Sequence, residues 1–260
     1  MKVQVLVATM NQTDYSLLDK MNIQTDAIVC NQCDKYDYAE FDYKGHNIKW
    51  FSFAERGVGL NRNNALMRAT ADVCVLADDD MIFQDGYCEI IERVFEKSNV
   101  EVAAFNLVES VVKRYVIDKK IRITKKNYGR YGAARIAFRR ESVVFNGISF
   151  NLLFGGGAKY SAGEDTLFLK DCIEKKLKFF GFPLALAYMN EEDRVSSWFS
   201  GYNDKYFLDK GVLYYCLNKR MCKALSLYHC FKHRKRYAEY GWKNAYKMMK
   251  KGIDALKYKK

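Results

Sequence analysis

Residues 72–80 read DVCVLADDD, an apolar run that ends in three adjacent aspartates. Such a run is typical of a strand buried inside a sheet. Like charges side by side repel one another, and partial burial increases that cost. A divalent cation removes the repulsion, and carboxylate oxygens are the ligands that Mg²⁺ and Mn²⁺ prefer. A solvated acidic turn or helix cap is the other interpretation, but the position at the end of a strand favours metal ligation by Asp78 and Asp80.

Strands and helices alternate on both sides of this stretch. Their order predicts an α/β fold with a mostly parallel central sheet flanked by helices. The basic segment 114–127 predicts a loop or an edge hairpin. Apolar runs predict further strands at residues 3–9, 26–30, 47–53, 101–108, 133–138 and 184–189, and helical spacing predicts helices at residues 59–69, 86–97 and 166–176.

Polar clusters follow three of the predicted strands, at residues 9–11, 31–34 and 78–80. Ligands of open parallel sheets bind beyond the carboxyl ends of the strands. The three clusters therefore predict a single crevice, in which Thr9, Asn11 and Asp34 join the acidic triplet.

A second acidic pair, Glu164 and Asp165, opens a predicted helix after the glycine-rich loop at 154–158. Acids favour helix amino termini as caps or as partners of the helix dipole. Beside a metal–phosphate site, a carboxylate at a helix start is also placed to accept a proton from an attacking hydroxyl. Asp165 is our candidate for that base, and Glu164 is the candidate for holding the acceptor or orienting the base.

Arg62 lies in the segment 57–64, which reads GVGLNRNN. Its glycines permit close approach of the backbone, and a guanidinium is suited to binding a diphosphate. An ordinary surface arginine is the equal alternative when this segment is taken alone.

Charge divides the chain into two regions. Residues 212–260 hold 14 Lys/Arg against Glu239 and Asp254, and so account for the whole formal net charge of +12. Basic residues interleaved with aromatic ones over 219–260 predict an interfacial helical segment on an anionic membrane surface. A helical cap with solvated lysines is the alternative. No apolar stretch approaches a membrane span of about 20 residues, so we expect a cytoplasmic protein, peripheral at the inner face of the membrane.

At this point the motifs resemble those of the family-two glycosyltransferases with the GT-A fold. The resemblance covers about residues 2–200 and is closest to the enzymes that build capsule, O-antigen or similar surface polysaccharides. The order and spacing of the motifs are more specific than any one of them. They are the first strand ending in ATMN at 8–11, the helix start GLNRNN at 59–64, the aspartates 78–80, and GED at 163–165.

The resemblance implies a donor site for a nucleotide sugar, with UDP as the favoured carrier. It implies that Thr9 and Asp34 lie beside the base and ribose and that Arg62 lies near the uracil or the diphosphate. Asp79 falls within the same donor-binding set. Asp78 and Asp80 then form the DxD pair, which contacts the ribose and a Mn²⁺ or Mg²⁺ ion, with Asp80 as the direct ligand.

The same resemblance implies inversion at the anomeric carbon, with Asp165 as the catalytic base and the metal stabilising the departing diphosphate. Many relatives carry a histidine metal ligand after the last core strand, where this chain reads NEED at 190–193. The Gln-x-x-Arg-Trp motif of processive synthases is absent, so transfer of a single sugar to a glycan or lipid-linked glycan is expected.

The expected organisation is a catalytic domain over 1–200, with a nucleotide-binding half at about 1–108 and an acceptor-binding half at about 109–200, followed by a basic helical extension over 201–260. Two other functions share some of these features. A nucleic-acid-binding protein would use the basic tail, but no recognised nucleic-acid-binding motif is present and no nucleic-acid partner is expected. A nucleotidyltransferase also uses paired acids and metal, but it carries an early glycine-rich loop with lysine, where this chain reads MNQT at 10–13.

Overall fold

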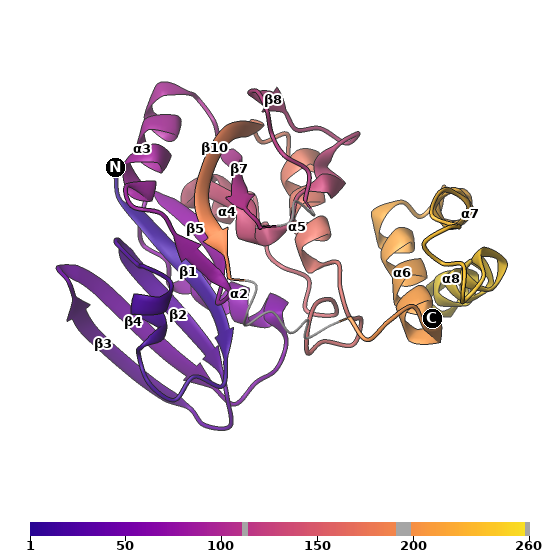
Figure 1. The fold of residues 1–260 in the computed structure, drawn as a ribbon, viewed down its shortest axis with the longest axis horizontal. Coiled ribbons are helices and arrows are strands. Elements are labelled where there is room, and N and C mark those ends of the chain that lie inside the picture. The colour runs from indigo at the N-terminus through magenta and orange to yellow at the C-terminus, as the bar shows by residue number, and fades with distance from the viewer. Residues whose placement is uncertain (111–113, 191–198, 258–260) are drawn as a thin grey trace.

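The computed structural model describes residues 1–110, 114–190 and 199–257. Within them, ten strands form one mixed sheet in the order β3-β4-β2-β1-β5-β9-β7-β10-β6, with β8 paired to β10 (Figure 1). The strands are β1 (Val3–Met10), β2 (Asp26–Gln32), β3 (Asp37–Tyr43), β4 (His46–Phe53), β5 (Val73–Asp78), β6 (Met81–Phe83), β7 (Val102–Val108), β8 (Ile121–Arg122), β9 (Ile136–Arg139) and β10 (Phe179–Met189).

The parallel core of the sheet is β4-β2-β1-β5, as the alternation of elements predicts. In this register Ala8 pairs with Asp78, and Thr9 pairs with Asn31. The carboxyl ends of β1, β2 and β5 therefore meet at one edge. Antiparallel strands flank this core, because β9 runs against both β5 and β7 and β3 runs against β4.

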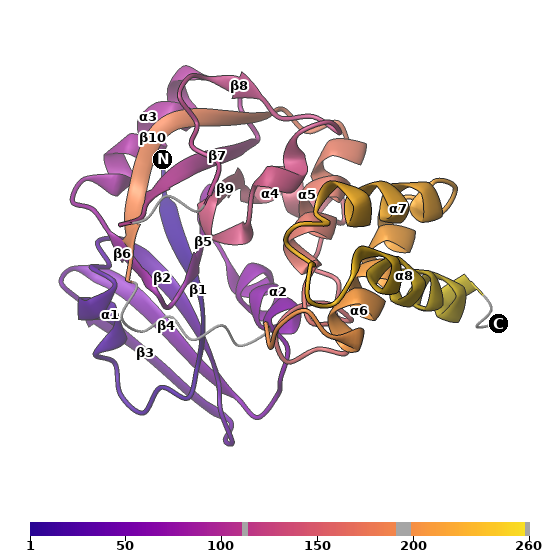
Figure 2. The ribbon, with the colours of Figure 1, turned by 45° about the vertical axis from the view of Figure 1, so that its right-hand side comes forward.

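Helices cover both faces of the sheet (Figure 2). Alternate residues of β1 serve opposite faces: Val5 and Val7 belong to a core with α1 and α3, whereas Leu6 belongs to a core with α2, α4 and α5. This period of two is that of a strand buried on both sides. The helices of this part are α1 (Leu17–Lys20), α2 (Val58–Arg68), α3 (Tyr87–Lys97), α4 (Arg140–Phe145) and α5 (Glu164–Glu174).

Several elements differ from the sequence-based expectations: α1, α4 and β6 were not predicted, and three further differences concern strands. Strand β3 was not predicted, because charged residues interrupt its apolar ones and its side chains are exposed or half-buried. It pairs with β4 across the turn at Lys44 and Gly45. Residues 133–135 form a 3-10 helix, so β9 begins only at Ile136. Strand β10 begins at Phe179, ahead of Pro183, and its register shifts between Gly181 and Ala185, where the proline cannot donate a ladder hydrogen bond.

The C-terminal region is helical, as its sequence predicts. It comprises α6 (Asp204–Leu217), α7 (Cys222–Lys232) and α8 (Trp242–Lys257), which pack on one another (Figure 1). Val212 and Leu213 of α6 share a buried cluster with Phe154, Tyr160 and Leu167 of the preceding part. In the part of the chain that the structure describes, no helix is long and apolar enough to cross a membrane.

Candidate active site

A cleft of about 610 Å³ opens at the carboxyl ends of the parallel strands. Seven of the nine residues singled out from the sequence line it, although they come from four separate segments. These residues are Thr9, Arg62, Asp78, Asp79, Asp80, Glu164 and Asp165. The prediction that these polar residues converge on one crevice is therefore correct for seven of the nine.

The acidic triplet turns its first two carboxylates to different partners. Asp79 Oδ2 accepts a 2.6 Å hydrogen bond from Thr9 Oγ1, whereas Asp78 Oδ1 accepts a 2.6 Å bond from Arg62 Nη2. Burial raises the pKa of Asp79 above its ordinary value; the Thr9 hydrogen bond opposes this shift and the charge of Asp78 adds to it. Adjacent carboxylates of the triplet thus differ in environment.

Arg62 joins the two acidic motifs. Its side chain is buried, and its guanidinium contacts Asp78 at 2.6 Å and Glu164 at 2.9 Å. Burial alone lowers the pKa of Arg62, but the charges of Asp78 and Glu164 outweigh it and raise the pKa above the ordinary value. Arg62 therefore stays charged and fixes the end of β5 relative to the start of α5.

The start of α5 presents two carboxylates with different surroundings. Glu164 is buried and is bonded to Arg62 through Oε1 and to the Gly163 backbone N–H through Oε2. Burial raises the pKa of Glu164, the charge of Asp165 adds to that shift, and Arg62 opposes it. Asp165 accepts a 2.6 Å bond from the Thr166 backbone N–H through Oδ1 and lines the cleft. Glu164 is thus engaged by the protein, whereas Asp165 faces the cleft.

The glycine-rich loop brings the backbone close to this pair. Gly155 has φ of +105°, and a Cβ there would lie 2.4 Å from Val58 Cγ1 and 2.8 Å from Glu164 Oε2. The Val58 backbone N–H donates to the Gly156 carbonyl at 2.9 Å. Only glycine fits such an approach, so the loop determines how α2 and α5 meet.

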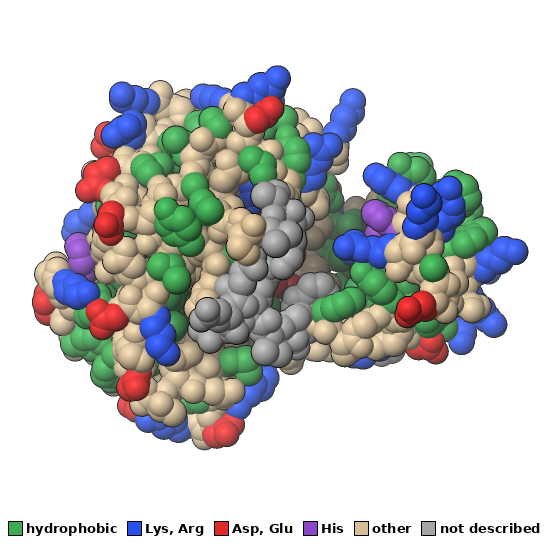
Figure 3. Space-filling model, in the orientation of Figure 1, with side chains coloured by type: hydrophobic (Ala, Val, Ile, Leu, Met, Phe, Trp, Pro, Cys, Tyr) green, Lys and Arg blue, Asp and Glu red, His purple; other side chains and the backbone are tan. Residues whose placement is uncertain are grey.

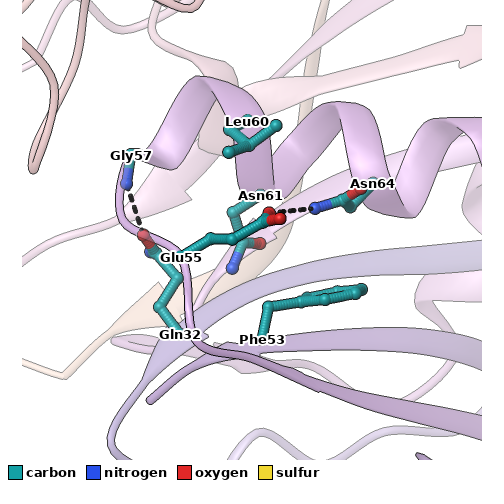
Figure 4. A pocket seen from close by; sticks show the side chains of 7 residues that line it. All are labelled: Gln32, Phe53, Glu55, Gly57, Leu60, Asn61 and Asn64. Carbon is teal, nitrogen blue, oxygen red and sulfur yellow. Dashed lines mark hydrogen bonds between the residues drawn. The ribbon is translucent and has the colours of Figure 1, made fainter. Parts of the chain in front are cut away.

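The loop between β4 and α2 lies along another side of the cleft, which Arg56 and Val58 line. Gln32 Oε1 accepts a 2.7 Å hydrogen bond from the Gly57 backbone N–H, and Asn64 Nδ2 donates to Glu55 Oε2 at 3.4 Å (Figure 4). Gln32 also lines the large cleft. These contacts hold the amino terminus of α2 against the end of β2.

Two predicted donor-site residues do not line the cleft. Asn11 has an exposed side chain and a left-handed backbone with φ of 56°, and its N–H donates to the Gln32 carbonyl. Asp34 is exposed and pairs with Arg56 Nη2 at 2.5 Å. Since Arg56 does line the cleft, Asp34 reaches the cleft through that arginine. Their predicted roles beside the nucleotide remain predictions.

The sequence interpretation missed Arg135, which also lines the cleft. Arg135 is 3% exposed and donates to the Phe105 and Tyr115 carbonyls, each at 2.6 Å, and to Asn106 Oδ1 at 3.0 Å. Burial lowers its pKa. Arg135 is the single charged residue in the run 131–138. A charged residue inside such a run is the signal in the sequence that could have identified it.

Among the described residues, no three His, Cys, Asp or Glu side chains are grouped to hold a metal ion by themselves. Asp78 and Asp80 do line the cleft together. Mg²⁺ commonly takes one or two carboxylates and completes its shell with water and substrate phosphates. The donor set therefore fits an ion shared with a diphosphate. Of the stretch 190–193, where the resemblance led us to look for a further ligand, residues 191–193 lie outside the described residues.

Comparisons with known proteins agree with this architecture. Residues 33–154 match the family model Glycosyl transferase family 2, whereas no curated protein matches the sequence significantly. S. aureus TarS 1-349 in complex with UDP-GlcNAc is similar with a TM-score of 0.60 and 18% identity, over 84% of this chain and 67% of that one. The same TarS segment in complex with UDP has a TM-score of 0.60 and 15% identity, over 100% and 92% of the two chains.

A further TarS structure has a TM-score of 0.57 and 17% identity, and the match covers 82% of this chain but 39% of that one. At such identities the likeness establishes the fold. The antiparallel edge strands, the parallel core and the cleft at its carboxyl ends are those of the GT-A fold. Residues 33–154 of this fold match the family model Glycosyl transferase family 2, and this match together with the TarS fold supports glycosyltransferase activity.

Proposed function

We propose that this chain transfers a single sugar from a nucleotide sugar, of the UDP type, to an acceptor hydroxyl with inversion at the anomeric carbon. The observation that carries the proposal is the meeting of Asp78, Asp80 and Asp165 in one cleft, with Arg62 joining the two acidic motifs. The similar fold of TarS in complex with UDP-GlcNAc and with UDP supports a UDP-sugar donor.

In this proposal Asp165 accepts the proton of the acceptor hydroxyl. The acceptor oxygen then forms a bond to the anomeric carbon, the bond from that carbon to the diphosphate breaks, and the nucleoside diphosphate leaves. Asp78 and Asp80 would hold a Mn²⁺ or Mg²⁺ ion, which would supply Lewis-acid stabilisation of the diphosphate. Glu164, being bonded to Arg62, positions the arginine and the start of α5.

Surface-polysaccharide synthesis is the proposed setting, with a glycan or lipid-linked glycan as acceptor. The α7 helix supports a location at a membrane. Its exposed apolar face comprises Leu227, Tyr228 and Phe231, which are 42%, 63% and 52% exposed. Lys232 lies over the Tyr228 ring and Arg234 over the Phe231 ring, at 5.7 and 4.7 Å from the centroids. Apolar side chains bordered by cations suit the surface of an anionic bilayer.

The donor site is tested by calorimetric titration of the purified protein with UDP, with and without Mn²⁺. We expect binding that depends on the metal and that is lost in Asp80→Ala, because this change removes the proposed direct ligand. Asp85→Ala is the matched control, since Asp85 follows β6 but lies outside the cleft and bonds Asn22 and Gln24.

Binding of UDP that is equally tight without metal, or in Asp80→Ala, would show that the proposed ion site is wrong. If the unaltered protein does not bind UDP but binds GDP or dTDP, the donor sugar is carried by that nucleotide instead. The proposed sugar transfer then still stands. If none of the three nucleotides binds, the proposed donor site is wrong.

A further inference from the structure

Gly132 lies beside the proposed base. It lines the cleft together with Asp165, and a Cβ on Gly132 would lie 3.4 Å from Asp165 Oδ2. Apart from Gly132 and its two chain neighbours, no other heavy atom of the described residues lies within 4 Å of that Cβ position. A side chain at residue 132 would therefore enter the open space of the cleft next to Asp165.

The two oxygens of Asp165 have different surroundings. Oδ1 accepts a 2.6 Å hydrogen bond from the Thr166 backbone N–H and a 3.2 Å bond from Thr166 Oγ1. Oδ2 is the oxygen on the side of Gly132. A hydroxyl that gives its proton to this oxygen must come within about 2.6–3.2 Å of it. The hydroxyl and a side chain at residue 132 would therefore share the same small space.

Neither the backbone nor the packing of the protein requires glycine at this position. Gly132 has φ of −104° and ψ of 167°, an extended conformation that other residues adopt without strain. A Cβ there would only touch Asp165 Oδ2, whereas a Cβ on Gly155 would lie 2.4 Å from Val58 Cγ1. The structural consequence of the missing side chain at residue 132 is therefore open space beside the proposed base.

Arg135 fixes Gly132 at this place. The Arg135 backbone N–H donates to the Gly132 carbonyl at 3.3 Å and closes the short 3-10 helix that follows Gly132. The buried guanidinium of Arg135 donates to the Phe105 and Tyr115 carbonyls, each at 2.6 Å. Because this turn is tied to β7 through Phe105, we expect a side chain at residue 132 to stay beside Asp165.

The rim of the cleft near this point meets the helical region. Ser161 lines the cleft and donates through Oγ to Asp209 of α6 at 2.6 Å. The molecular surface is hollowed between the part that carries the cleft and the helices α6–α8 (Figure 3). This side of the cleft therefore leaves room for an acceptor that is larger than water.

We propose that Gly132 determines which acceptors are used, because its missing side chain leaves the space in which an alcohol larger than water meets Asp165. This inference rests on the proposed function and deepens it. The class of acceptor that it names is an alcohol whose carbon atoms adjoin the reacting hydroxyl on the side of Gly132. Water carries no such atoms and needs less of that space.

Competition between water and glycerol as acceptors tests the proposal. The unaltered protein, Gly132→Ala and Gly132→Val are incubated with Mn²⁺ and UDP-GlcNAc, or in parallel UDP-glucose, in aqueous glycerol. Transfer to water gives UDP and the free sugar, whereas transfer to glycerol gives UDP and a glycerol glycoside; in both cases the acceptor proton passes to Asp165. The ratio of glycoside to free sugar is measured by mass spectrometry. Both products come from the same active molecules, so this ratio does not depend on how much of a variant is folded.

We expect the ratio to fall about tenfold or more in Gly132→Val, since displacing a reacting group by about 1 Å costs up to about 100-fold in rate. The fall is expected to be smaller in Gly132→Ala, which adds a single methyl group. Gly129→Val is the matched control, because Gly129 is exposed, lies outside the cleft lining and has nothing within 4 Å of a Cβ.

The possible outcomes separate this inference from the proposed function. An unchanged ratio in Gly132→Val, or an equal fall in Gly129→Val, would show that residue 132 does not select the acceptor, and the proposed transfer would stand. If the unaltered protein forms free sugar but no glycoside, the open space does not admit an alcohol and the inference is wrong. If it forms neither product from either donor, the proposed function fails, and this inference fails with it.

Discussion

Adjacent residues in this cleft have different tasks because the backbone turns them to different partners. Glu164 and Asp165 are neighbours at the start of α5, yet Glu164 is buried against Arg62 while Asp165 faces the cleft. Removing one partner of a buried ion pair leaves the other charge buried and uncompensated, at a cost of about 3–5 kcal/mol. Arg62 in particular pairs with Asp78 at the end of β5 and with Glu164 at the start of α5, so its loss would leave the buried Glu164 without its charged partner.

At the level of the single residue, Asp165→Asn tests the base. We expect sugar transfer to fall at least about a hundredfold, because general-base catalysis contributes factors of about 10² to 10⁴, while UDP binding is retained. Transfer is measured as UDP release in the presence of the acceptor. Asp171→Asn, in the same helix, is the control. Near-normal transfer in Asp165→Asn with normal donor binding would remove Asp165 from the base role.

At the level of the elements, two glycines let α6 and α8 cross at close range. A Cβ on Gly211 would lie 2.0 Å from the Met249 carbonyl oxygen, and one on Gly252 would lie 2.1 Å from that of Leu208. Side chains at these positions would force the backbones apart. The packing of the helical region on the preceding part depends on this crossing, because Val212 and Leu213 of α6 share a buried cluster with Phe154, Tyr160 and Leu167.

We expect Gly252→Ala to destabilise the protein by about 1–3 kcal/mol, the usual cost of overpacking, measured as a lower midpoint in thermal denaturation. Helix propensity alone predicts the opposite, a gain of about 1 kcal/mol. Gly129→Ala serves as the control, since nothing lies within 4 Å of a Cβ there. A rise in the midpoint for Gly252→Ala would contradict the close crossing.

At the level of the whole molecule, the neutral body and the basic helices divide the proposed work. The cleft is lined by residues between Ala8 and Asp165, whereas the exposed apolar face lies on α7. The proposed donor site and the proposed membrane-binding surface are therefore on separate elements. Substitutions in the cleft and substitutions on the exposed face of α7 can therefore be made and tested separately.

Sedimentation with vesicles tests the membrane surface. We expect binding to vesicles rich in phosphatidylglycerol, weakened by salt, and little binding to phosphatidylcholine vesicles. Replacing Tyr228 and Phe231 together by serine is expected to reduce binding about tenfold or more, because two exposed aromatic anchors are lost. Phe145→Ser is the control, since Phe145 is 82% exposed on α4. Equal binding by both variants would exclude the α7 face.

Local patterns along the chain are enough to predict the parallel core and most of the cleft. Apolar runs ending in polar clusters identify strands whose carboxyl ends must meet, since parallel strands align those ends. This logic alone places Thr9 beside the acidic triplet, and the hydrogen bond from Thr9 to Asp79 agrees with it. Composition and periodicity likewise predict the helical, basic character of the residues beyond 200.

The pairing of charged groups, in contrast, follows from how distant segments pack. Arg62 and Glu164 are 102 positions apart, and no local pattern encodes a contact at that separation. The exposed strand β3 owes its place to pairing with β4, and the contact of Gly163 with Leu213 follows from the packing of α6 on the start of α5. Strand and helix periods are local properties of the sequence, whereas the partner of a side chain depends on the tertiary arrangement.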